Sequence, residues 1–178
     1  MLIALTGTPG VGKSTVAEIL RKRGYRVLHL NELAERFNCV IDEEDDCKVV
    51  DVDKLAKEVR KVVRGLTIVE GHLSHLLNPD LAIVLRCNPL LLKERLERRG
   101  WKEEKILENV EAELIDVILV EALDNVEEVY EIDTTNLTPE EVANAVEEIL
   151  KGVKDKYKPG RIDWLSEVGD HLDDIIRR

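Results

Sequence analysis

Short apolar runs alternate along this chain with longer stretches in which apolar residues recur every three or four positions. The short runs predict buried strands at residues 2–5, 27–30, 66–69, 81–85 and 129–132. The longer stretches predict helices at residues 13–23, 52–63, 89–99, 102–123 and 139–150. Strands that alternate with helices predict an α/β fold, a five-stranded parallel sheet covered by helices on both faces.

Several predicted helices carry signals at their ends. Asn88 can cap the helix that Pro89 begins, because proline lacks only an N–H that the first helical turn leaves unpaired. Thr138 can cap the helix at 139–150, and Glu141 stands where it completes a capping box. Gly24 follows the first helix and is placed to end it.

The length of 178 residues fits one domain that spans residues 1–178. Residues 154–160 are polar and turn-rich, so we expect residues from about 152 to 178 to form a C-terminal extension. Apolar side chains recur there at helical spacing, at Trp164, Leu165, Val168, Leu172 and Ile175. We expect this stripe to dock on the core, with a partner surface as the alternative.

Composition narrows the setting of the protein. No apolar run approaches the roughly 20 residues of a membrane span, and the start MLIALTGTPG lacks the basic residues of a secretory signal. We therefore expect no membrane partner. Cys39, Cys47 and Cys87 show no CxxC spacing, which argues against a zinc site or a disulfide framework. Reduced thiols and a cytoplasmic location are expected.

The chain is acidic, with a formal net charge of −11. A surface this negative repels phosphate backbones, and one Phe, two Trp and three Tyr are too few for rows of base-stacking platforms. Strong direct binding of nucleic acid is therefore not expected. Five consecutive acidic residues at 42–46 are interpreted as a solvated loop, with contact to a basic protein partner as the alternative.

Residues 7–15, GTPGVGKST, match the pattern GxxxxGK[ST] between a predicted strand and a predicted helix. Gly10 and Gly12 let backbone N–H groups turn inward, and these donors hold a polyphosphate together with the helix N-terminus. Lys13 can bridge the β- and γ-phosphates of ATP, and the Ser14 hydroxyl can ligate Mg²⁺. Thr15 would lie near the α-phosphate. A tight glycine turn that binds nothing is the alternative.

A phosphate loop predicts a nucleoside triphosphate but not the reaction. No NKxD segment, which reads guanine, occurs in the chain, and a large motor or AAA machine needs more residues. Small kinases and compact ATPases remain.

Two residues that follow the third predicted strand, Glu70 and His72, narrow the class of enzyme. Glu70 stands at the strand tip, where a carboxylate orders Mg²⁺ and water beside a phosphate loop. The alternative is a carboxylate that only accepts backbone N–H groups. His72 could orient an attacking water or hydrogen-bond a phosphate, and the alternative is a solvated loop histidine like His75.

Arginines cluster near the end of the helix at 89–99. A guanidinium on a mobile loop can spread its donors over the transferred phosphoryl group, and Arg99 at the helix end is the preferred catalytic arginine. Arg95 and Arg86 are second choices; we expect Arg86 to face the crevice at the strand ends. A salt-bridged helix face, with Arg98 among its members, is the alternative.

Taken together, the motifs resemble those of the nuclear-type adenylate kinases, also called coilin-interacting nuclear ATPases, which have archaeal relatives. The resemblance covers roughly residues 1–150. It rests on TGTPGVGKST, DEEDDC, VVDVDKL, VEGH and LKERLERRGWKEEKILENVEAEL in this order.

The resemblance implies a nucleoside monophosphate kinase fold with a monophosphate-binding segment at about 29–50 and a lid at about 98–108. It implies an adenylate kinase-like transfer of phosphate from ATP, with Mg²⁺, to AMP or related monophosphates. It also implies ATPase activity and a role in late small ribosomal subunit maturation through a platform ribosomal protein. The family's Asp-x-His pair falls on Glu70 and His72, with Glu replacing Asp, and its lid arginine falls on Arg99.

Two further functions stay open. In an ATP-hydrolysing assembly factor that acts on a ribosomal protein, nucleotide binding and hydrolysis would switch the mobile segments between states that bind and release the partner. A kinase for a metabolite that is not a nucleotide is compatible with the phosphate loop, but the other motifs do not support it.

Overall fold

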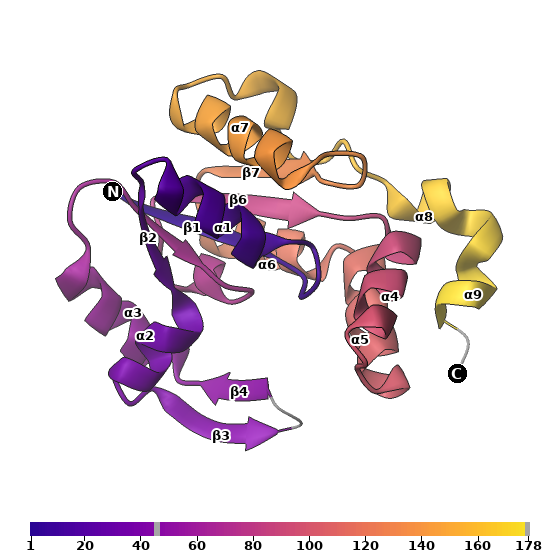
Figure 1. Ribbon diagram of the computed structural model, residues 1–178, viewed down its shortest axis with the longest axis horizontal. Helices are drawn as coiled ribbons and strands as arrows, with labels where there is room; N and C mark the ends of the chain where they lie inside the picture. Colours follow the sequence, from indigo (N-terminus) through magenta and orange to yellow (C-terminus); the bar gives the residue numbers. More distant parts are fainter. Residues whose placement is uncertain (45–46, 177–178) are drawn as a thin grey trace.

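The computed structural model describes residues 1–44 and 47–176. Its centre is a five-stranded sheet in the order β2-β5-β1-β6-β7, and every neighbouring pair is parallel (Figure 1). The strands are β1 (Leu2–Gly7), β2 (Arg26–His29), β5 (Thr67–Glu70), β6 (Leu81–Arg86) and β7 (Val129–Asp133). The predicted α/β fold with five parallel strands is therefore confirmed.

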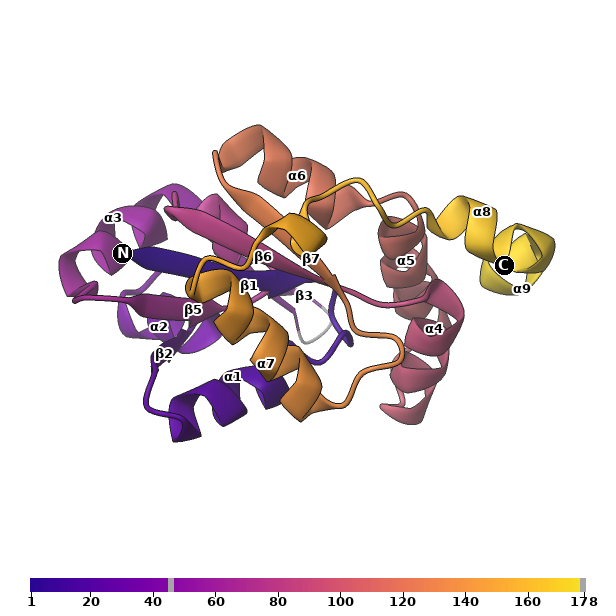
Figure 2. The same cartoon turned by 90° about the horizontal axis from the view of Figure 1, so that it is seen from above.

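Helices cover both faces of this sheet (Figure 2). The α-helices are α1 (Lys13–Lys22), α2 (Leu30–Arg36), α3 (Val52–Val62), α4 (Pro89–Arg98), α5 (Glu103–Leu114), α6 (Val117–Asn125), α7 (Pro139–Leu150), α8 (Trp164–Val168) and α9 (Leu172–Ile176). Short 3₁₀ helices are η1 (Ser74–Leu76), η2 (Asp155–Tyr157) and η3 (Gly169–His171).

The two-residue period of the strands divides the core into layers. Ile3 and Leu5 of β1 point to one face and pack in a cluster with α1 and α7. Ala4 of the same strand points to the other face, where Val84 joins it against α6. Leu2 also lies on that face, in a cluster with residues of α2 and α3. Since both faces of the inner strands β1, β5 and β6 are buried, these strands are nearly continuous apolar runs.

The single long helix predicted at 102–123 is wrong. The chain forms α5 and α6 there, separated at Asp116, which adopts a left-handed conformation with φ 61°. The side chain of Asp116 accepts a hydrogen bond from the Arg86 guanidinium, so it serves the sheet end and not a helix. The break turns α6 onto the face of the sheet, where Leu119 and Ala122 are buried.

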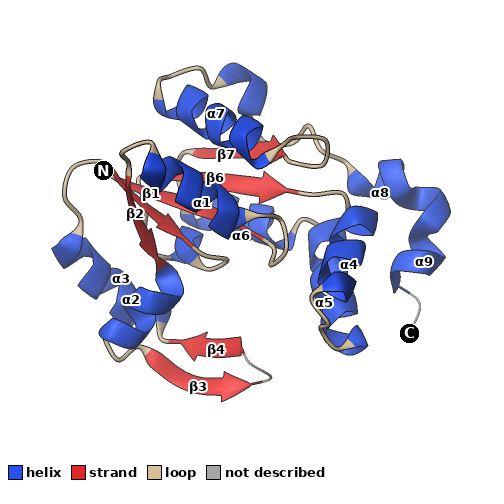
Figure 3. Ribbon diagram, in the orientation of Figure 1, coloured by secondary structure: helices blue, strands red, loops and turns tan. Residues whose placement is uncertain are grey.

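The acidic run is not a loop over its described part. Residues 40–50 contain an antiparallel hairpin of β3 (Val40–Glu44) and β4 (Cys47–Val50), which stands apart from the main sheet (Figure 3). Asp42, Glu43 and Glu44 lie in β3 and are exposed, as a solvated segment should be. Residues 45 and 46 of the run lie outside the described residues.

The capping signals are confirmed. The Asn88 side chain accepts the Leu90 N–H, and Thr138 and Glu141 form the complete capping box of α7. Helix α7 packs on α1, the helix that follows the glycine-rich turn.

Residues after α7 return to the molecule. Helices α8 and α9 lie beside α4 and α5 (Figures 1 and 2). Trp164, Val168 and Ile175 of the predicted stripe are buried in the main core, and Leu172 packs against it, whereas Leu165 is 51% exposed. Within residues 1–44 and 47–176, no helix is long and apolar enough to cross a membrane.

Candidate functional site

The glycine-rich turn after β1 adopts a conformation that requires glycine. Gly10 and Gly12 have φ of 98° and 102°, in the left-handed region. A Cβ on Gly10 would also lie 2.8 Å from Leu92 and 2.9 Å from Leu96, so the turn packs directly on α4. Helix α1 begins at Lys13, and its N-terminal amides point toward the space inside the turn. This geometry favours binding of an anion.

Lys13 reaches back across the turn. Its ammonium group donates to the carbonyl oxygens of Gly7 at 2.7 Å and Thr8 at 3.2 Å. Burial lowers the pKa of Lys13 to about 8, with a further lowering by Arg99, while the carboxylates of Glu70 and Glu113 act in the opposite direction. An anion bound in the turn would favour the charged form of this lysine.

Glu70 ends β5 beside the turn and is 8% exposed. It pairs in register with His29, the last residue of β2, and His29 Nδ1 donates to Glu70 Oε2 at 2.8 Å. The carboxylate is thus oriented by a side chain and not by backbone N–H groups alone. His29 was not predicted as a site residue, although it lies near the end of the strand predicted at residues 27–30.

His72 lies two residues further on and lines the same cavity as Lys13 and Glu70. Burial lowers the pKa of His72 to about 4, and the positive charges of Lys13 and Lys105, with that of His75 when it is protonated, lower it further. The imidazole is therefore neutral at pH 7 and has one nitrogen that can accept a hydrogen bond from water.

All these side chains meet in one cavity of about 440 Å³. The preferred site residues all line it, whereas the second choices Arg86 and Arg95 do not: the lining contains Gly10, Gly12, Lys13, Ser14, Thr15, Glu70, His72 and Arg99. The two hydroxyl residues at the start of α1 are exposed and reachable by a ligand. Asn31, Glu32 and Trp101 also line this cavity and were not predicted.

Arg99 follows α4 at its C-cap and is exposed, as a mobile arginine should be. The second choice, Arg95, contacts the glycine-rich turn, with one guanidinium nitrogen 3.4 Å from the Gly10 carbonyl oxygen. Arg98 pairs with Glu94 at 2.8 Å on the exposed face of the helix, which is the salt-bridge alternative for this arginine.

A second cavity, of about 350 Å³, adjoins the first. The two share Pro9, His72 and Trp101 in their walls. The second cavity is closed by Glu44 and Val49 of the hairpin on one side and by residues 101–109 on the other. Trp101, Lys102, Lys105 and Asn109 are the members of that wall with aromatic, cationic or amide groups.

Two expectations are wrong. Arg86 does not face the crevice, because it is 1% exposed and its guanidinium is bound by Glu113 at 2.7 Å and Glu131 at 2.9 Å. His75 is not solvated, because it is fully buried between Thr6 at 2.8 Å and Glu121 at 3.0 Å. Both residues are bound by partners that are far away in the sequence, so the local sequence pattern could not reveal that they are buried.

The oxygen groups in the first cavity fit a magnesium ion carried by a nucleotide. Mg²⁺ prefers oxygen ligands and in such sites uses one or two protein groups together with phosphates and waters. The exposed Ser14 hydroxyl stands at the start of α1, and the Glu70 carboxylate lines the same cavity. Ser14 would hold the ion, which would neutralise charge on the phosphates.

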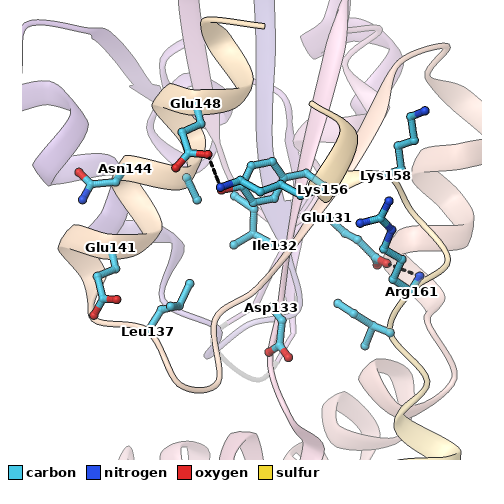
Figure 4. Close-up of a pocket in the computed structure, with 13 residues that line it drawn as sticks. Glu131, Ile132, Asp133, Leu137, Glu141, Asn144, Glu148, Lys156, Lys158 and Arg161 are labelled. Atoms are coloured by element: carbon cyan, nitrogen blue, oxygen red, sulfur yellow. Dashed lines mark hydrogen bonds and ion pairs between the residues drawn. The ribbon is translucent and has the colours of Figure 1, made fainter. Parts of the chain in front are cut away.

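A third cavity, of about 450 Å³, lies between β7, α7 and the segment at 156–162 (Figure 4). Its walls contain no part of the glycine-rich turn. Lys156, which projects into it, pairs with Glu148 at 2.7 Å. This cavity therefore lacks the phosphate-binding features of the first.

Solved structures share the fold of the chain. A shikimate kinase from Acinetobacter baumannii, in complex with shikimate, aligns over 86% of this chain and 94% of its own, with a TM-score of 0.59 and 18% identity. A shikimate kinase from Bacteroides thetaiotaomicron aligns over 85% and 98%, with a TM-score of 0.55 and 17% identity. At these identities the likeness concerns the fold, which is that of small P-loop kinases.

Sequence relatives are closer. A protein of Archaeoglobus fulgidus named "Putative adenylate kinase" is 60% identical over 100% of this chain and 99% of its own. Proteins of the same name from Methanocaldococcus jannaschii and Pyrococcus abyssi are 46% and 48% identical over 97% and 99% of this chain, and 97% and 98% of their own. A family model described as an AAA domain matches residues 3–116. The chain therefore belongs to the AAA-domain P-loop family and, within it, to the archaeal group whose members bear the adenylate kinase name.

Proposed function

We propose that this protein is an adenylate kinase-like phosphotransferase, which moves the γ-phosphate of ATP to AMP or a related nucleoside monophosphate with Mg²⁺. We propose further that it hydrolyses ATP and acts in the cytoplasm in late maturation of the small ribosomal subunit. The adenylate kinase name of the archaeal relatives supports the first part.

One observation carries the kinase proposal: two cavities meet at His72, and only one of them is lined by Gly10, Gly12 and Lys13 of the glycine-rich turn. A donor triphosphate in the first cavity would point its terminal phosphate toward the second. An acceptor in the second cavity would then lie in line with it. Positioning of this kind supplies most of the rate in phosphoryl transfer.

Each predicted residue has a role in this arrangement. The amides at Gly10 and Gly12 and the Lys13 ammonium would hold the β- and γ-phosphates, with Thr15 near the α-phosphate. Glu70 would order the water shell of the magnesium ion. Arg99 would spread its donors over the transferred group when the segment around it closes.

We assign two mobile segments and a C-terminal extension to a single domain of residues 1–178. The segment at about 29–50 would bind the monophosphate, and the segment at about 98–108 would act as the lid. Both contribute to the wall of the second cavity, which supports this assignment. The extension at about 152–178 belongs to the same domain, since α8 and α9 pack on α4 and α5.

Hydrolysis and the ribosomal role form the second candidate, an assembly factor with little kinase activity. The neutral imidazole of His72 can accept a hydrogen bond from water near the terminal phosphate, which favours some hydrolysis. The net charge of −11 and the exposed acidic side chains of β3 suit a cationic partner such as a platform ribosomal protein of the small subunit.

One experiment separates the two candidates. Purified protein is mixed with ATP, Mg²⁺ and each monophosphate in turn, and the diphosphate formed is measured against the phosphate released. We expect diphosphate formation that depends on AMP or a related monophosphate. Phosphate release that ignores the monophosphate and rises with the ribosomal protein would reject the kinase in favour of the assembly factor.

Lys13→Ala is the control for both activities. It removes the charge that bridges the phosphates, so transfer and hydrolysis should both fall by about 100-fold or more. Circular dichroism should show that the fold is retained. Equal turnover by this variant would contradict the proposed role of the glycine-rich turn.

A further inference from the structure

Glu113, near the end of α5, is a buried carboxylate that the proposed reaction does not use. It is 2% exposed and lies behind the glycine-rich turn, outside the walls of the two catalytic cavities. A buried carboxylate is costly unless donors satisfy it. The donors that satisfy Glu113 come from three distant parts of the chain.

One carboxylate oxygen of Glu113 binds a residue of the phosphate loop. Thr8 Oγ1 donates to Glu113 Oε2 at 2.7 Å, and Thr8 is itself 2% exposed. The carbonyl oxygen of the same threonine accepts from Lys13 Nζ at 3.2 Å. Glu113 therefore fixes the residue of the turn on which the phosphate-binding lysine rests.

The other oxygen of Glu113 accepts hydrogen bonds from a core residue and from the C-terminal extension. Glu113 Oε1 accepts from Arg86 Nε at 2.7 Å and from Trp164 Nε1 at 3.1 Å. Trp164 begins α8 and is 1% exposed. One carboxylate thus joins the phosphate loop to a residue about 150 positions further along the chain.

A second carboxylate anchors the same extension. Glu131 of β7 binds Arg86 through Oε2 at 2.9 Å. Its Oε1 accepts the backbone N–H groups of Gly160 at 3.0 Å and Arg161 at 3.2 Å. Figure 4 shows Glu131 turned toward the segment that carries Arg161. Residues 160–164 are therefore attached to Arg86 at two points, through Glu131 and through Glu113.

We propose that Glu113 and Trp164 are positioning residues for the phosphate loop, and that the C-terminal extension sets the conformation of this loop through the chain Trp164–Glu113–Thr8. Loss of the indole N–H leaves a buried carboxylate short of a donor. The carboxylate then shifts toward Arg86 and the Cys87 N–H, which are the donors left on Oε1, and loosens its hold on Thr8. Since coupling between two sites is reciprocal, changes at Thr8 must also reach the extension.

The experiment uses Trp164→Phe, which keeps an aromatic ring and removes the N–H. Hydrogen exchange of the amides at residues 8–15 is followed by mass spectrometry without nucleotide. We expect these amides to exchange at least about threefold faster than in the unchanged protein, as in local loosening of a loop. Magnesium-ATP binding should weaken by about fivefold, at the low end of coupling between sites.

Tyr157→Phe is the matched control. Tyr157 also lies in the extension, and its hydroxyl donates to a carboxylate, Glu148, at 3.1 Å, but this carboxylate is not in contact with Glu113. Loop exchange in Tyr157→Phe should match the unchanged protein. Faster exchange in both variants, or in neither, would overturn the proposal.

A second pair of variants decides the matter if Trp164→Phe does not fold. Thr8→Val removes the hydroxyl at nearly constant shape, and Thr8→Ser restores it. By reciprocity, Thr8→Val should speed exchange of the amides at 160–168, and Thr8→Ser should return it to the original rate. Unchanged exchange at 160–168 in Thr8→Val would overturn the proposal.

The affinity part of this inference rests on the proposed function, whereas the exchange part does not. If the protein forms no diphosphate with any monophosphate, the kinase proposal fails, and loop exchange still decides the role of Glu113 and Trp164.

Discussion

At the scale of single residues, the main feature of the site is that burial changes the pKa of its lysine and its histidine. Lys13 and His72 line one cavity, and burial lowers the pKa of each, which disfavours the charged form. A bound triphosphate would favour the charged form of the lysine. In the protein alone the histidine is neutral at pH 7, because its pKa is about 4. The cavity therefore combines a cation that suits phosphate with a neutral imidazole that can accept a hydrogen bond from water.

His72→Ala tests the second of these groups. We expect ATP hydrolysis to fall by about tenfold or more, because a positioned proton acceptor typically contributes at least this much. Phosphate transfer to AMP should fall much less, since the acceptor phosphate carries its own negative oxygen as nucleophile. Both rates are measured on the same preparation. Equal loss of the two rates would remove the water-orienting role.

His75 gives a prediction about stability and pH. Its ring is held between Thr6 and Glu121, and burial lowers its pKa, with a smaller lowering by Lys13 and an opposite effect of Glu121. The unfolded chain protonates this histidine near pH 6.5, before the folded protein does. Its contribution to stability is therefore complete above about pH 6.5 and is lost as pH falls below it.

Urea unfolding at pH 7.5, 6.5 and 5.5 measures this effect. The unchanged protein should lose stability across the series, and His75→Gln, which cannot titrate, should lose less. His72 shifts in the same direction and remains in both proteins, so the difference between them isolates His75. Parallel curves for the two proteins would contradict the assignment.

The position of a candidate site residue was predictable where a short segment, or the end of a predicted strand or helix, places it, as for Glu70 and Arg99. The glycine-rich turn, Lys13 and Ser14 form one local segment, and all three were predicted. Arg86 was misplaced because its partners Glu113 and Glu131 lie 27 and 45 positions away. No local pattern shows that these carboxylates surround it.

At the scale of elements, α7 supports α1, the helix that begins at Lys13. The Thr138 hydroxyl accepts a hydrogen bond from the Glu141 N–H at 3.2 Å. The Glu141 carboxylate accepts one from the Thr138 N–H at 3.3 Å. This box fixes the start of α7, and Ala143 and Val146 of α7 lie in one cluster with Val16 and Leu20 of α1.

Thr138→Ala should lower the free energy of unfolding by about 1 kcal/mol, the usual effect of losing such a cap. For a chain of this size, a loss of this amount lowers Tm by about 2–4 °C. Thermal unfolding measures the shift. Thr138→Ser keeps the hydroxyl and should stay near the original Tm, and a matching fall in Thr138→Ser would show that the cap is not the cause.

Elements were predictable where one period dominates. The inner strands β5, β1 and β6 are buried along their whole length, the edge strands β2 and β7 carry shorter apolar runs, and all five were predicted. The hairpin of β3 and β4 was missed because Asp42, Glu43 and Glu44 are exposed and carry no apolar alternation. The break at Asp116 was missed because its left-handed conformation serves Arg86, which is distant in sequence.

At the scale of the whole molecule, the arrangement of elements creates the site. Strands β1 and β5 end side by side, so the glycine-rich turn and Glu70 meet at one edge of the sheet. The hairpin and the segment after α4 then close the adjoining cavity from two sides. The extension binds behind this edge through Trp164 and Glu131, and its sequence alone indicated docking but not these contacts.

The central claim is that the two adjoining cavities form one site for a donor and an acceptor nucleotide. A bisubstrate compound, diadenosine pentaphosphate, joins two adenosines by a phosphate chain and can occupy both cavities at once. Isothermal titration calorimetry measures its binding beside that of ATP and AMP.

We expect one molecule of the compound to bind per chain, more tightly than either ATP or AMP, and binding to be lost in Lys13→Ala. Prior saturation with ATP or with AMP should weaken this binding. Affinity no greater than that of ATP, or binding that AMP does not oppose, would contradict a shared donor and acceptor site.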